Sequence, residues 1–374
     1  EAEGRSAVVR LKMPREGKLA LDDLVRGRVE FDWATEQDHV VRRADGSFIY
    51  HLANVVDDQD FEITHVIRAE EHLSNTPRQV FMIRSLGYRL PAYAHLPFVA
   101  EPGSKTKLSK RKLDKYLKNN DFKKLLEHGE KIAAKMGLSL ERDTFNPVIV
   151  DFYKSVGYLP EAIVNAMAMV GWALDDKTEL FLKPADLVEG FSLEKVTRGA
   201  ASFDPAKLFS FEEKHMQHRS VEEKYLLCKP FLVNAPFGPD TALDVRKLLR
   251  FAGDRVKVAG DILDFDEFFV GDEDMSYDPT ALQKRILDAP DAKPLLTEFA
   301  ERLRSQDDWS HEALHQLMER FLEEKQITAA RIIHALRVAA TGKATGIGMF
   351  EAMELLGKES TLNRLERALK IDRA

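Results

Sequence analysis

The chain has 374 residues, of which 44% are hydrophobic and 31% are charged, and its formal net charge is −7. This length predicts two or three domains, and no apolar run approaches the roughly 20 residues that a membrane-spanning helix needs. The acidic charge argues against a general nucleic-acid coat protein but leaves room for RNA binding by a local basic face. The single cysteine, Cys228, excludes an internal disulfide framework and a cysteine-rich zinc site.

The first segment, residues 1–47, alternates apolar and polar positions, with Gly and Asp at the breaks. The run Leu24–Phe31 is typical of this pattern, which predicts short strands and hairpins. A turn is expected at Arg42–Gly46. The next element therefore begins after this turn.

An apolar segment, Tyr50–Asp58, carries one phenol, one amide and two carboxylates. Tyr50 and Asn54 are four residues apart, so a helix would place both polar groups on one face. Such a face could orient a polar ligand. An ordinary amphipathic helix with a hydrogen-bonded tyrosine explains the same pattern.

The run Phe61–Arg68 is typical of a strand, and acidic residues follow it at Glu70 and Glu71. An arginine at the carboxyl end of a strand can bind a carboxylate through two hydrogen bonds. The alternative is a salt bridge between Arg68 and one of the nearby glutamates. Both interpretations remain open from these residues alone.

A helix is expected to begin at Ser74–Pro77, because proline favours the first helical turn. It is predicted to continue to Gly87, with Val80, Ile83 and Leu86 in the core.

A basic loop follows the strand-like run His95–Ala100 and the turn Pro102–Ser104. Its sequence is Lys107-Leu108-Ser109-Lys110-Arg111. Two ammonium groups three residues apart form a cation cluster suited to a chain of phosphates. Lysine runs are usually solvated surface, but loops at the carboxyl ends of strands are where open α/β sheets bind ligands. We therefore consider this loop a candidate nucleotide-binding element.

From Leu113 onward the spacing of apolar residues is mainly helical, and 217–374 is almost wholly so. Residues Leu113–Thr144 predict a helical hairpin on the surface. Two linked α-helical bundles are expected for 217–374.

Six blocks of the chain together resemble class I aminoacyl-tRNA synthetases, and specifically the bacterial glutamyl-tRNA synthetase family. In this sequence they are Tyr50–Asp58, Thr64–His72, Asn75–Gln79, Lys107–Arg111, Gly157–Ala162 and Leu355–Glu359. The blocks occur in the family's order and cover the chain nearly end to end. The resemblance implies an α/β plus all-α fold: the C-terminal half of a Rossmann-like catalytic domain, then a helical stem-contact domain and an all-α anticodon-binding region.

The resemblance also implies a division into five segments. These are the end of an acceptor-stem-binding insertion (1–47), the second half of the nucleotide-binding domain (48–112), a lineage-specific helical insertion (113–144), the stem-contact domain (145–216) and the anticodon-binding region (217–374). Most relatives cross the position of the insertion within a few residues. Whether the insertion restrains the lysine loop, contacts tRNA or does neither stays open.

Residue roles follow from the matched positions. The resemblance implies that Lys107 and Lys110 are catalytic and that Glu71, Leu108, Ser109, Lys110 and Arg111 bind ATP. The glutamate-binding residues are Tyr50, Asn54 and Arg68, and the tRNA-binding residues are Arg255 and Arg337. For the last two, surface ion pairing is the alternative. Mg²⁺ is expected to travel with ATP, with no metal ligands and no zinc site in this chain.

The implied function is that of a glutamate–tRNA ligase, which converts L-glutamate and ATP into glutamyl-adenylate and transfers the glutamyl group to the 3′ end of tRNA(Glu). A cytoplasmic monomer is expected, with no DNA or membrane partner. The family's second signature, His-x-Gly-His, does not occur in this sequence. We therefore expect an N-terminally truncated chain that is impaired on its own.

Two other functions are compatible with parts of this pattern. One is a non-catalytic tRNA-binding protein derived from a synthetase, which the missing histidine signature favours. The other is the short relative that glutamylates a modified tRNA base. That relative lacks an anticodon-binding region, so the helical pattern of 217–374 argues against it.

Overall fold

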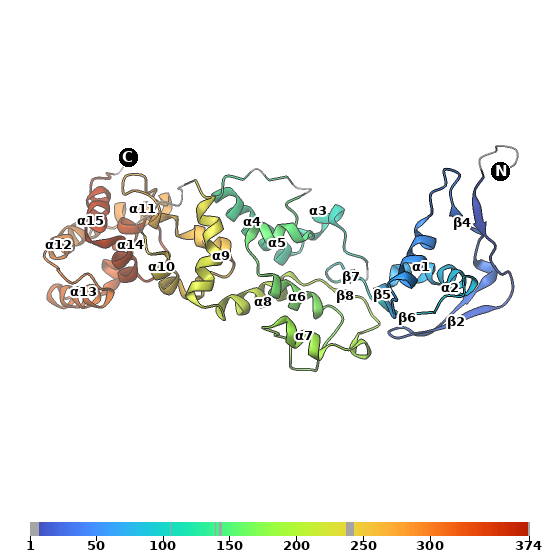
Figure 1. Cartoon of the computed structure of the whole chain (residues 1–374). Helices are drawn as coiled ribbons and strands as arrows, with labels where there is room; N and C mark the ends of the chain where they lie inside the picture. The colour runs from blue at the N-terminus through green and yellow to red at the C-terminus, as the bar shows by residue number, and fades with distance from the viewer. Residues whose placement is uncertain (1–6, 105, 139, 142–143, 237–242, 373–374) are drawn as a thin grey trace. The chain divides into compact units, whose positions relative to one another are not determined.

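The computed structural model describes residues 7–104, 106–138, 140–141, 144–236 and 243–372 (Figure 1). The chain forms two compact units, one from 1–120 with 161–208 and the other from 121–160 with 209–374. Within the described residues, no helix is both long enough and apolar enough to cross a membrane. The finer division into five segments stays a prediction.

The first unit contains a mixed four-stranded sheet in the order β3-β2-β6-β5. Its strands are β2 (Lys18–Asp23), β3 (Gly27–Asp32), β5 (His65–Ala69) and β6 (Ala92–Leu96). Strands β2 and β3 form an antiparallel hairpin, whereas β6 is parallel to both β2 and β5. A separate antiparallel pair joins β1 (Val9–Leu11) to β4 (His39–Arg42). The strands predicted for the first segment are thus confirmed, and two of them share a sheet with β5 and β6.

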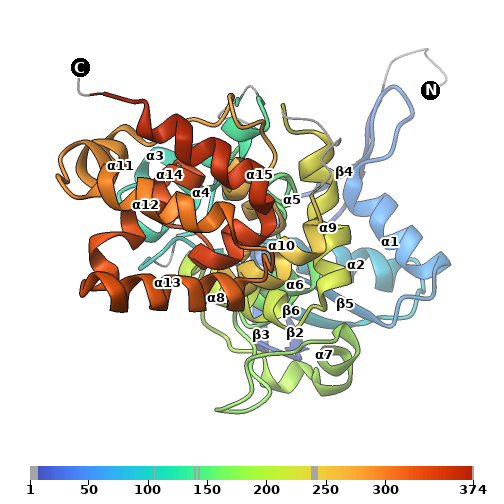
Figure 2. The ribbon, with the colours of Figure 1, turned by 90° about the vertical axis from the view of Figure 1, so that its left-hand side faces the viewer.

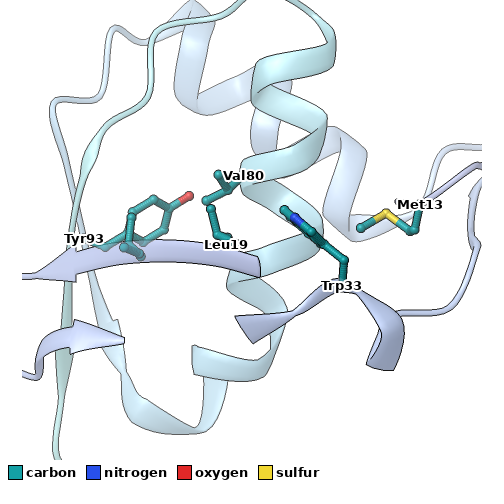
Figure 3. Packing of buried hydrophobic residues seen from close by; sticks show 6 residues of the cluster. Met13, Leu19, Trp33, Val80 and Tyr93 are labelled. Carbon is teal, nitrogen blue, oxygen red and sulfur yellow. The ribbon is translucent and has the colours of Figure 1, made fainter. Parts of the chain in front are cut away.

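Two helices, α1 (Tyr50–Asp60) and α2 (Thr76–Ser85), follow the predicted positions. Side chains of β2, β6 and α2 meet in one core, with Trp33 from the short 3-10 helix η1 (Trp33–Thr35) at its edge (Figure 3). The labelled members of this core are Met13, Leu19, Trp33, Val80 and Tyr93. The sheet and α2 therefore hold each other in place through apolar burial.

Three predictions about this region need correction. Leu86 is 46% exposed, because α2 ends at Ser85 and the chain turns at Gly87, whose φ is 70°. Strand β5 begins at His65, after a turn in which Glu62 has a φ of 55°. The run His95–Ala100 is not one strand, since Pro97 has no N–H for a ladder and β6 ends at Leu96.

The rest of the first unit is built from short elements. Strand β7 (Val99–Ala100) pairs in parallel with β8 (Ala201–Ser202). The helical elements are η2 (Glu70–Asn75), η3 (Lys110–Lys112), α3 (Leu113–Tyr116), α6 (Pro160–Ala168), α7 (Pro184–Gly190) and η4 (Leu193–Lys195). The basic loop thus follows β7 and continues into η3.

The described residues of the second unit form helices and no strands. They are α4 (Asn120–Lys135), α5 (Val150–Val156), α8 (Pro205–Gln217), α9 (Val221–Val233), α10 (Val245–Ala252), η5 (Gly253–Arg255), η6 (Ala259–Phe268), α11 (Pro279–Leu282), the π-helix η7 (Gln283–Leu287), α12 (Ala292–Arg304), α13 (His311–Lys325), η8 (Ala329–Arg331), α14 (Ile333–Thr341) and α15 (Met349–Leu369). Figure 2 shows α12, α14 and α15 side by side. The helical prediction for 217–374 is confirmed over the described part.

A buried arginine ties this helical unit together. Arg364 of α15 is 2% exposed, and its Nε donates to Asp272 Oδ1 at 2.7 Å. Its Nη1 donates to the carbonyl of Glu267 at 2.9 Å, and its Nη2 donates to the carbonyl of Val270 at 3.1 Å. The guanidinium therefore satisfies the carbonyl groups at the end of η6 and compensates its own burial.

The segment 113–144 does not form the predicted surface hairpin. Helix α3 belongs to the first unit and α4 to the second, where Phe122, Leu125 and Ile132 are at most 6% exposed. The packing is tight: a Cβ added at Gly129 would lie 2.7 Å from the Phe152 ring. The apolar spacing of α4 thus reflects a face buried in a core, so the prediction of a separate hairpin was wrong, although the opposite face of α4 is exposed.

Candidate active site

Arg68 lies in β5, one residue before the strand ends, and three neutral groups hold its guanidinium. Its Nε donates to His95 Nε2 at 3.1 Å, Nη1 donates to Gln79 Oε1 at 2.7 Å, and Nη2 donates to Thr76 Oγ1 at 2.9 Å. Thr76 and Gln79 are three residues apart in α2 and so lie on one face. Each Nη keeps a second N–H, which leaves two donors for a ligand.

The alternative of a salt bridge from Arg68 to a nearby glutamate is not found. Glu70 pairs with Arg26, and Glu71 pairs with Lys107. Within the described ranges no carboxylate forms an ion pair with Arg68. Burial lowers the pKa of Arg68, which means that its positive charge is poorly compensated by the protein. A bound carboxylate would supply the missing negative charge.

His95 connects Arg68 to a buried carboxylate, Asp23. The imidazole is fully buried, and its Nδ1 lies 2.6 Å from Asp23 Oδ2. Because Nε2 accepts from Arg68, the proton belongs on Nδ1, which donates to Asp23. Burial lowers the pKa of His95, which favours this neutral form. Burial raises the pKa of Asp23, but hydrogen bonds from Arg26 and His95 outweigh it and bring the pKa below its usual value.

The two other predicted glutamate-binding residues come from α1. Asn54 Oδ1 accepts a hydrogen bond from Gln79 Nε2 at 3.0 Å, so Gln79 bridges Asn54 and Arg68. Tyr50 is the first residue of α1 and is 58% exposed. The structure therefore brings Asn54 and Arg68 together through a residue without a role predicted from the sequence, and leaves Tyr50 accessible to a ligand.

The lysine loop begins on the return arm of a short hairpin. Leu108 N–H donates to Val99 O at 2.9 Å, and Glu101 N–H donates to Thr106 O at 2.8 Å. Lys107 Nζ lies 2.6 Å from Glu71 Oε2, and this contact lowers the pKa of Glu71. Glu71 lies in η2, directly after β5. A predicted catalytic residue, Lys107, and a predicted ATP-binding residue, Glu71, thus meet just beyond the carboxyl end of β5.

The remaining positions of the loop are open to solvent or partly so. Lys110 and Arg111 are exposed, and Leu108 and Ser109 are half-buried. Helix η3 begins at Lys110, so both cationic side chains start a helical turn. The loop therefore presents its cations at the surface of the first unit.

A buried carboxylate, Glu101, anchors this loop. It is 1% exposed and accepts hydrogen bonds from Lys112 Nζ at 2.8 Å, from Lys115 Nζ and from the Tyr116 hydroxyl at 3.2 Å. The two lysines lower the pKa of Glu101 to about 2. Tyr116 Oη in turn accepts from the Ser109 N–H at 3.0 Å. Tyr116, the last residue of α3, therefore links the buried carboxylate to the backbone between the two loop lysines.

Among the residues of these networks, six that connect Arg68 or the lysine loop to their surroundings had no role predicted from the sequence. Gln79 and Thr76 stand in a matched block without an assigned role, and the three-residue spacing on a helix was the available signal. No local pattern signalled the other four, which are Asp23, His95, Glu101 and Tyr116.

The second unit contains a cavity of about 900 Å³ that both predicted tRNA-binding arginines line. The lining consists of Lys131, Lys135, Arg255, Asp264, Phe265, Ser276, Tyr277, Asp278, Arg337, Lys343, Ala344, Thr345 and Gly346. Arg337 Nη1 donates to Ile347 O at 2.6 Å. Burial lowers the pKa of Arg337, and the positive charge of Arg255 lowers it further. The alternative of surface ion pairing is not found, since neither arginine pairs with a carboxylate among the described side chains.

A group of possible metal ligands, His311, Glu312 and Glu354, lies elsewhere in the second unit. His311 Nδ1 is 2.6 Å from Glu354, whereas Nε2 is 3.1 Å from Glu312. Lys247 Nζ is 2.6 Å from the other Glu354 oxygen. Because the ring nitrogens face different carboxylates and an ammonium pairs with one of them, this group is an ion-pair network. Cys228 is buried, and burial raises its thiol pKa to about 12.

Two family models, each matching a different part of the chain, together cover most of its length. The family model for the class I (E and Q) tRNA synthetase catalytic domain matches residues 1–138, and the anticodon binding domain model matches 223–369. The chain is thus a class I aminoacyl-tRNA synthetase with a helical anticodon-binding domain. The α/β plus all-α fold class predicted from the sequence is confirmed.

Individual relatives narrow the class to one family. The glutamate–tRNA ligase of Moorella thermoacetica is 34% identical over 375 residues, which cover 99% of this chain and 69% of the relative. That of Geobacter sulfurreducens is 33% identical, covering 98% of this chain and 70% of the relative. The crystal structure of a glutamate–tRNA ligase from Elizabethkingia meningosepticum, in complex with its amino acid, has a TM-score of 0.80 at 28% identity, covering 98% of this chain and 68% of that one.

The chain belongs to the glutamate–tRNA ligase family. These matches confirm the prediction of a glutamate–tRNA ligase enzyme. They do not favour the alternative of a non-catalytic tRNA-binding protein.

Proposed function

We propose that this protein acts as a glutamate–tRNA ligase through a site formed by the Arg68 network and the lysine loop. The observation that carries the proposal is the Lys107–Glu71 pair, which joins the loop to the end of β5 beside Arg68. The site combines cations suited to phosphates with a buried guanidinium suited to a carboxylate. Activation of an acidic amino acid by ATP needs both the phosphate-binding cations and the carboxylate-binding guanidinium.

Arg68 is the carboxylate-binding residue of the proposed glutamate site. Its two remaining N–H groups suit a bidentate carboxylate, and its contacts with His95, Gln79 and Thr76 hold it in one orientation. The amide of Asn54 and the phenol of Tyr50 complete the site as neutral groups, which avoid the desolvation cost of further charges. Fixing the amino acid in this way makes the following attack effectively intramolecular.

The lysine loop serves ATP. An oxygen of the glutamate α-carboxylate attacks the α-phosphorus, a new P–O bond forms, and the bond to the β-phosphate breaks, which gives glutamyl-adenylate and pyrophosphate. Lys107 and Lys110 stabilise the charge that develops on the phosphates, and Leu108, Ser109 and Arg111 complete the phosphate-binding turn. Glu71 is placed on the ribose or adenine side of the nucleotide. Mg²⁺ bound to ATP would neutralise further phosphate charge.

The cavity with Arg255 and Arg337 is assigned to the anticodon of tRNA(Glu). A guanidinium can donate to base edges and stack on unpaired bases, and single-stranded loops are the part of an RNA that proteins read by sequence. The terminal ribose 2′-hydroxyl of the same tRNA then attacks the glutamyl-adenylate carbonyl and releases AMP. We place this reaction in the cytoplasm and expect a monomer.

The direct test is aminoacylation by the gene product that carries this chain. With labelled glutamate and tRNA(Glu), the proposal predicts ATP-dependent charging of the tRNA, and no charging with glutamine. Charging with an amino acid other than glutamate, or modification of an internal base of the tRNA, would overturn it.

A further inference from the structure

Helix α4 packs firmly onto the part of the second unit that carries Arg255. His128 Nε2 lies 2.6 Å from Asp261 Oδ1, and Lys131 Nζ lies 2.6 Å from Asp264 Oδ2. A Cβ added at Gly260 would be 2.7 Å from Ile132, so backbone and side chain touch at this point. Helix α4 is therefore packed into the second unit as one of its core helices.

Two lysines of this helix reach the cavity that Arg255 and Arg337 line. Lys131 and Lys135 are both among the lining residues. Lys135 Nζ donates to Leu263 O at 2.8 Å and lies 3.1 Å from Asp264. These contacts orient the two ammonium groups at the cavity. Lys131 uses one of its three donors in the contact with Asp264. Lys135 also lies 3.5 Å from Asp266 Oδ1, so its three donors have acceptors and a phosphate would have to replace one of them.

The composition of the cavity suits a polyanion with flat apolar groups. Five cationic side chains line it, against the two carboxylates of Asp264 and Asp278. Three of the five are paired with carboxylates at or next to the cavity, whereas Arg255 and Arg337 have no carboxylate partner among the described side chains. Phe265 and Tyr277 add aromatic surface, and the Tyr277 hydroxyl is buried without a hydrogen-bond partner among the described residues. Aromatic and guanidinium surfaces stack on bases, while lysines bind phosphates as point charges. The volume, about 900 Å³, is at the upper end of the range for ligand sites, roughly 300–1,000 Å³.

We propose that α4, which belongs to the inserted segment 113–144, is part of the RNA-binding surface, with Lys131 and Lys135 bound to phosphates of the nucleotides that enter the cavity. This inference rests on the proposed function, because it takes tRNA as the ligand. It gives the inserted segment a role in substrate binding. The competing account is that the two lysines only clamp α4 to Asp264.

The test measures tRNA(Glu) affinity of the full 374-residue chain at several salt concentrations. The double variant Lys131→Ala/Lys135→Ala is compared with Lys123→Ala/Lys124→Ala, which removes the same charge from exposed positions of the same helix outside the cavity lining. We expect the first variant to bind on the order of tenfold more weakly at low salt, and the slope of log K against log salt to fall by about 1 for each phosphate that is no longer neutralised. The control variant should change neither the affinity nor the salt slope by a comparable amount.

A third variant, Asp264→Asn, separates RNA contact from clamping. It removes the acidic partner of both lysines, so the proposal predicts that tRNA affinity is kept or increased. If the lysines act only as clamps, Asp264→Asn weakens binding as much as the double alanine variant, and the proposal fails. The single variant Lys131→Ala, which keeps the Lys135 contacts, repeats the comparison if the double variant does not fold.

Two other outcomes of the binding experiment also test the inference. Equal affinities of the double variant and its control would overturn the inference while the proposed function stands. No binding of tRNA(Glu) by the unaltered chain would overturn the RNA-binding part of the proposed function and this inference with it.

Discussion

Lys107 Nζ and Glu71 Oε2 lie 2.6 Å apart, although 36 residues separate them in the sequence. The pair joins the basic loop to the turn that follows β5, the strand that carries Arg68. Both side chains are substantially exposed, so the bond itself adds little to stability. The pair matters because it brings the residues proposed to bind ATP close to those proposed to bind glutamate.

Replacing Arg68 with lysine should impair glutamate binding selectively. Lysine keeps the charge but loses the planar set of donors that contacts His95, Gln79 and Thr76. A hydrogen bond to a charged group is worth roughly 1.5–3 kcal/mol, so the KM for glutamate should rise on the order of 10- to 100-fold. Steady-state kinetics should show a much smaller change in the KM for ATP. Equal changes for both substrates would contradict the assignment.

Tyr116→Phe should slow the reaction through the loop. The variant removes the hydroxyl that connects Glu101 to the Ser109 N–H. Removing a hydrogen bond costs about 1 kcal/mol, so kcat should fall roughly fivefold if the loop is held mainly by this contact. The KM for glutamate should stay constant. Tyr225→Phe, in α9, serves as the control, and an unchanged kcat for Tyr116→Phe would show that the contact does not position the lysines.

The stability of the first unit should depend on pH through His95. Its pKa in the folded protein lies below the ordinary value of 6.5, chiefly because of burial, so the unfolded chain binds the proton more readily. This contribution to the free energy of unfolding is complete above about pH 6.5 and is lost as the pH falls toward the folded-state pKa. Asp23, whose pKa lies below 3.8, adds a further loss under more acidic conditions.

Thermal unfolding at about pH 7.5 and about pH 5.5 measures this effect. The decrease in the melting temperature should be smaller in His95→Asn than in the unaltered protein. His65→Asn, at an exposed position of β5, should keep the full decrease. The same decrease in all three proteins would mean that His95 does not titrate as described.

Arg337→Ala should weaken tRNA binding while leaving amino-acid activation nearly intact. A base contact is worth roughly 1–3 kcal/mol, which corresponds to a loss of affinity of about 5- to 150-fold. Pyrophosphate exchange at saturating tRNA should be almost unchanged. Arg304→Ala, on the exposed surface of α12, is the matched control. An unaltered binding titration would remove the assignment.

Much of the fold could be predicted from local patterns. The amphipathic interpretation of Tyr50–Asp58 matches α1, and proline at position 77 marked the start of α2. The pattern of 113–144 predicted helices correctly but not their burial. An apolar face looks the same in a sequence whether it covers a neighbouring core or stabilises a hairpin, so only the packing of Ile132 against Gly260 distinguishes the two.

Some of the geometry of the proposed site could be predicted where its residues stand in short motifs. Asn54 and Arg68 are indeed joined, through Gln79. The positioning residues were not predictable, since Asp23 and His95 are 72 residues apart and no periodicity encodes such a contact. Resemblance to a family transfers roles only to matched positions, so it could not supply Tyr116, which lies outside the matched blocks.

The lysine loop and the Arg68 network are proposed to act on one reaction. The most direct test of this proposal is the pre-steady-state rate of glutamyl-adenylate formation by the gene product that carries this chain, compared between Lys110→Ala and Lys118→Ala. The proposal predicts that Lys110→Ala slows this step on the order of 100-fold, with tRNA affinity preserved, while Lys118→Ala has no effect. An unchanged rate of adenylate formation in Lys110→Ala would contradict it.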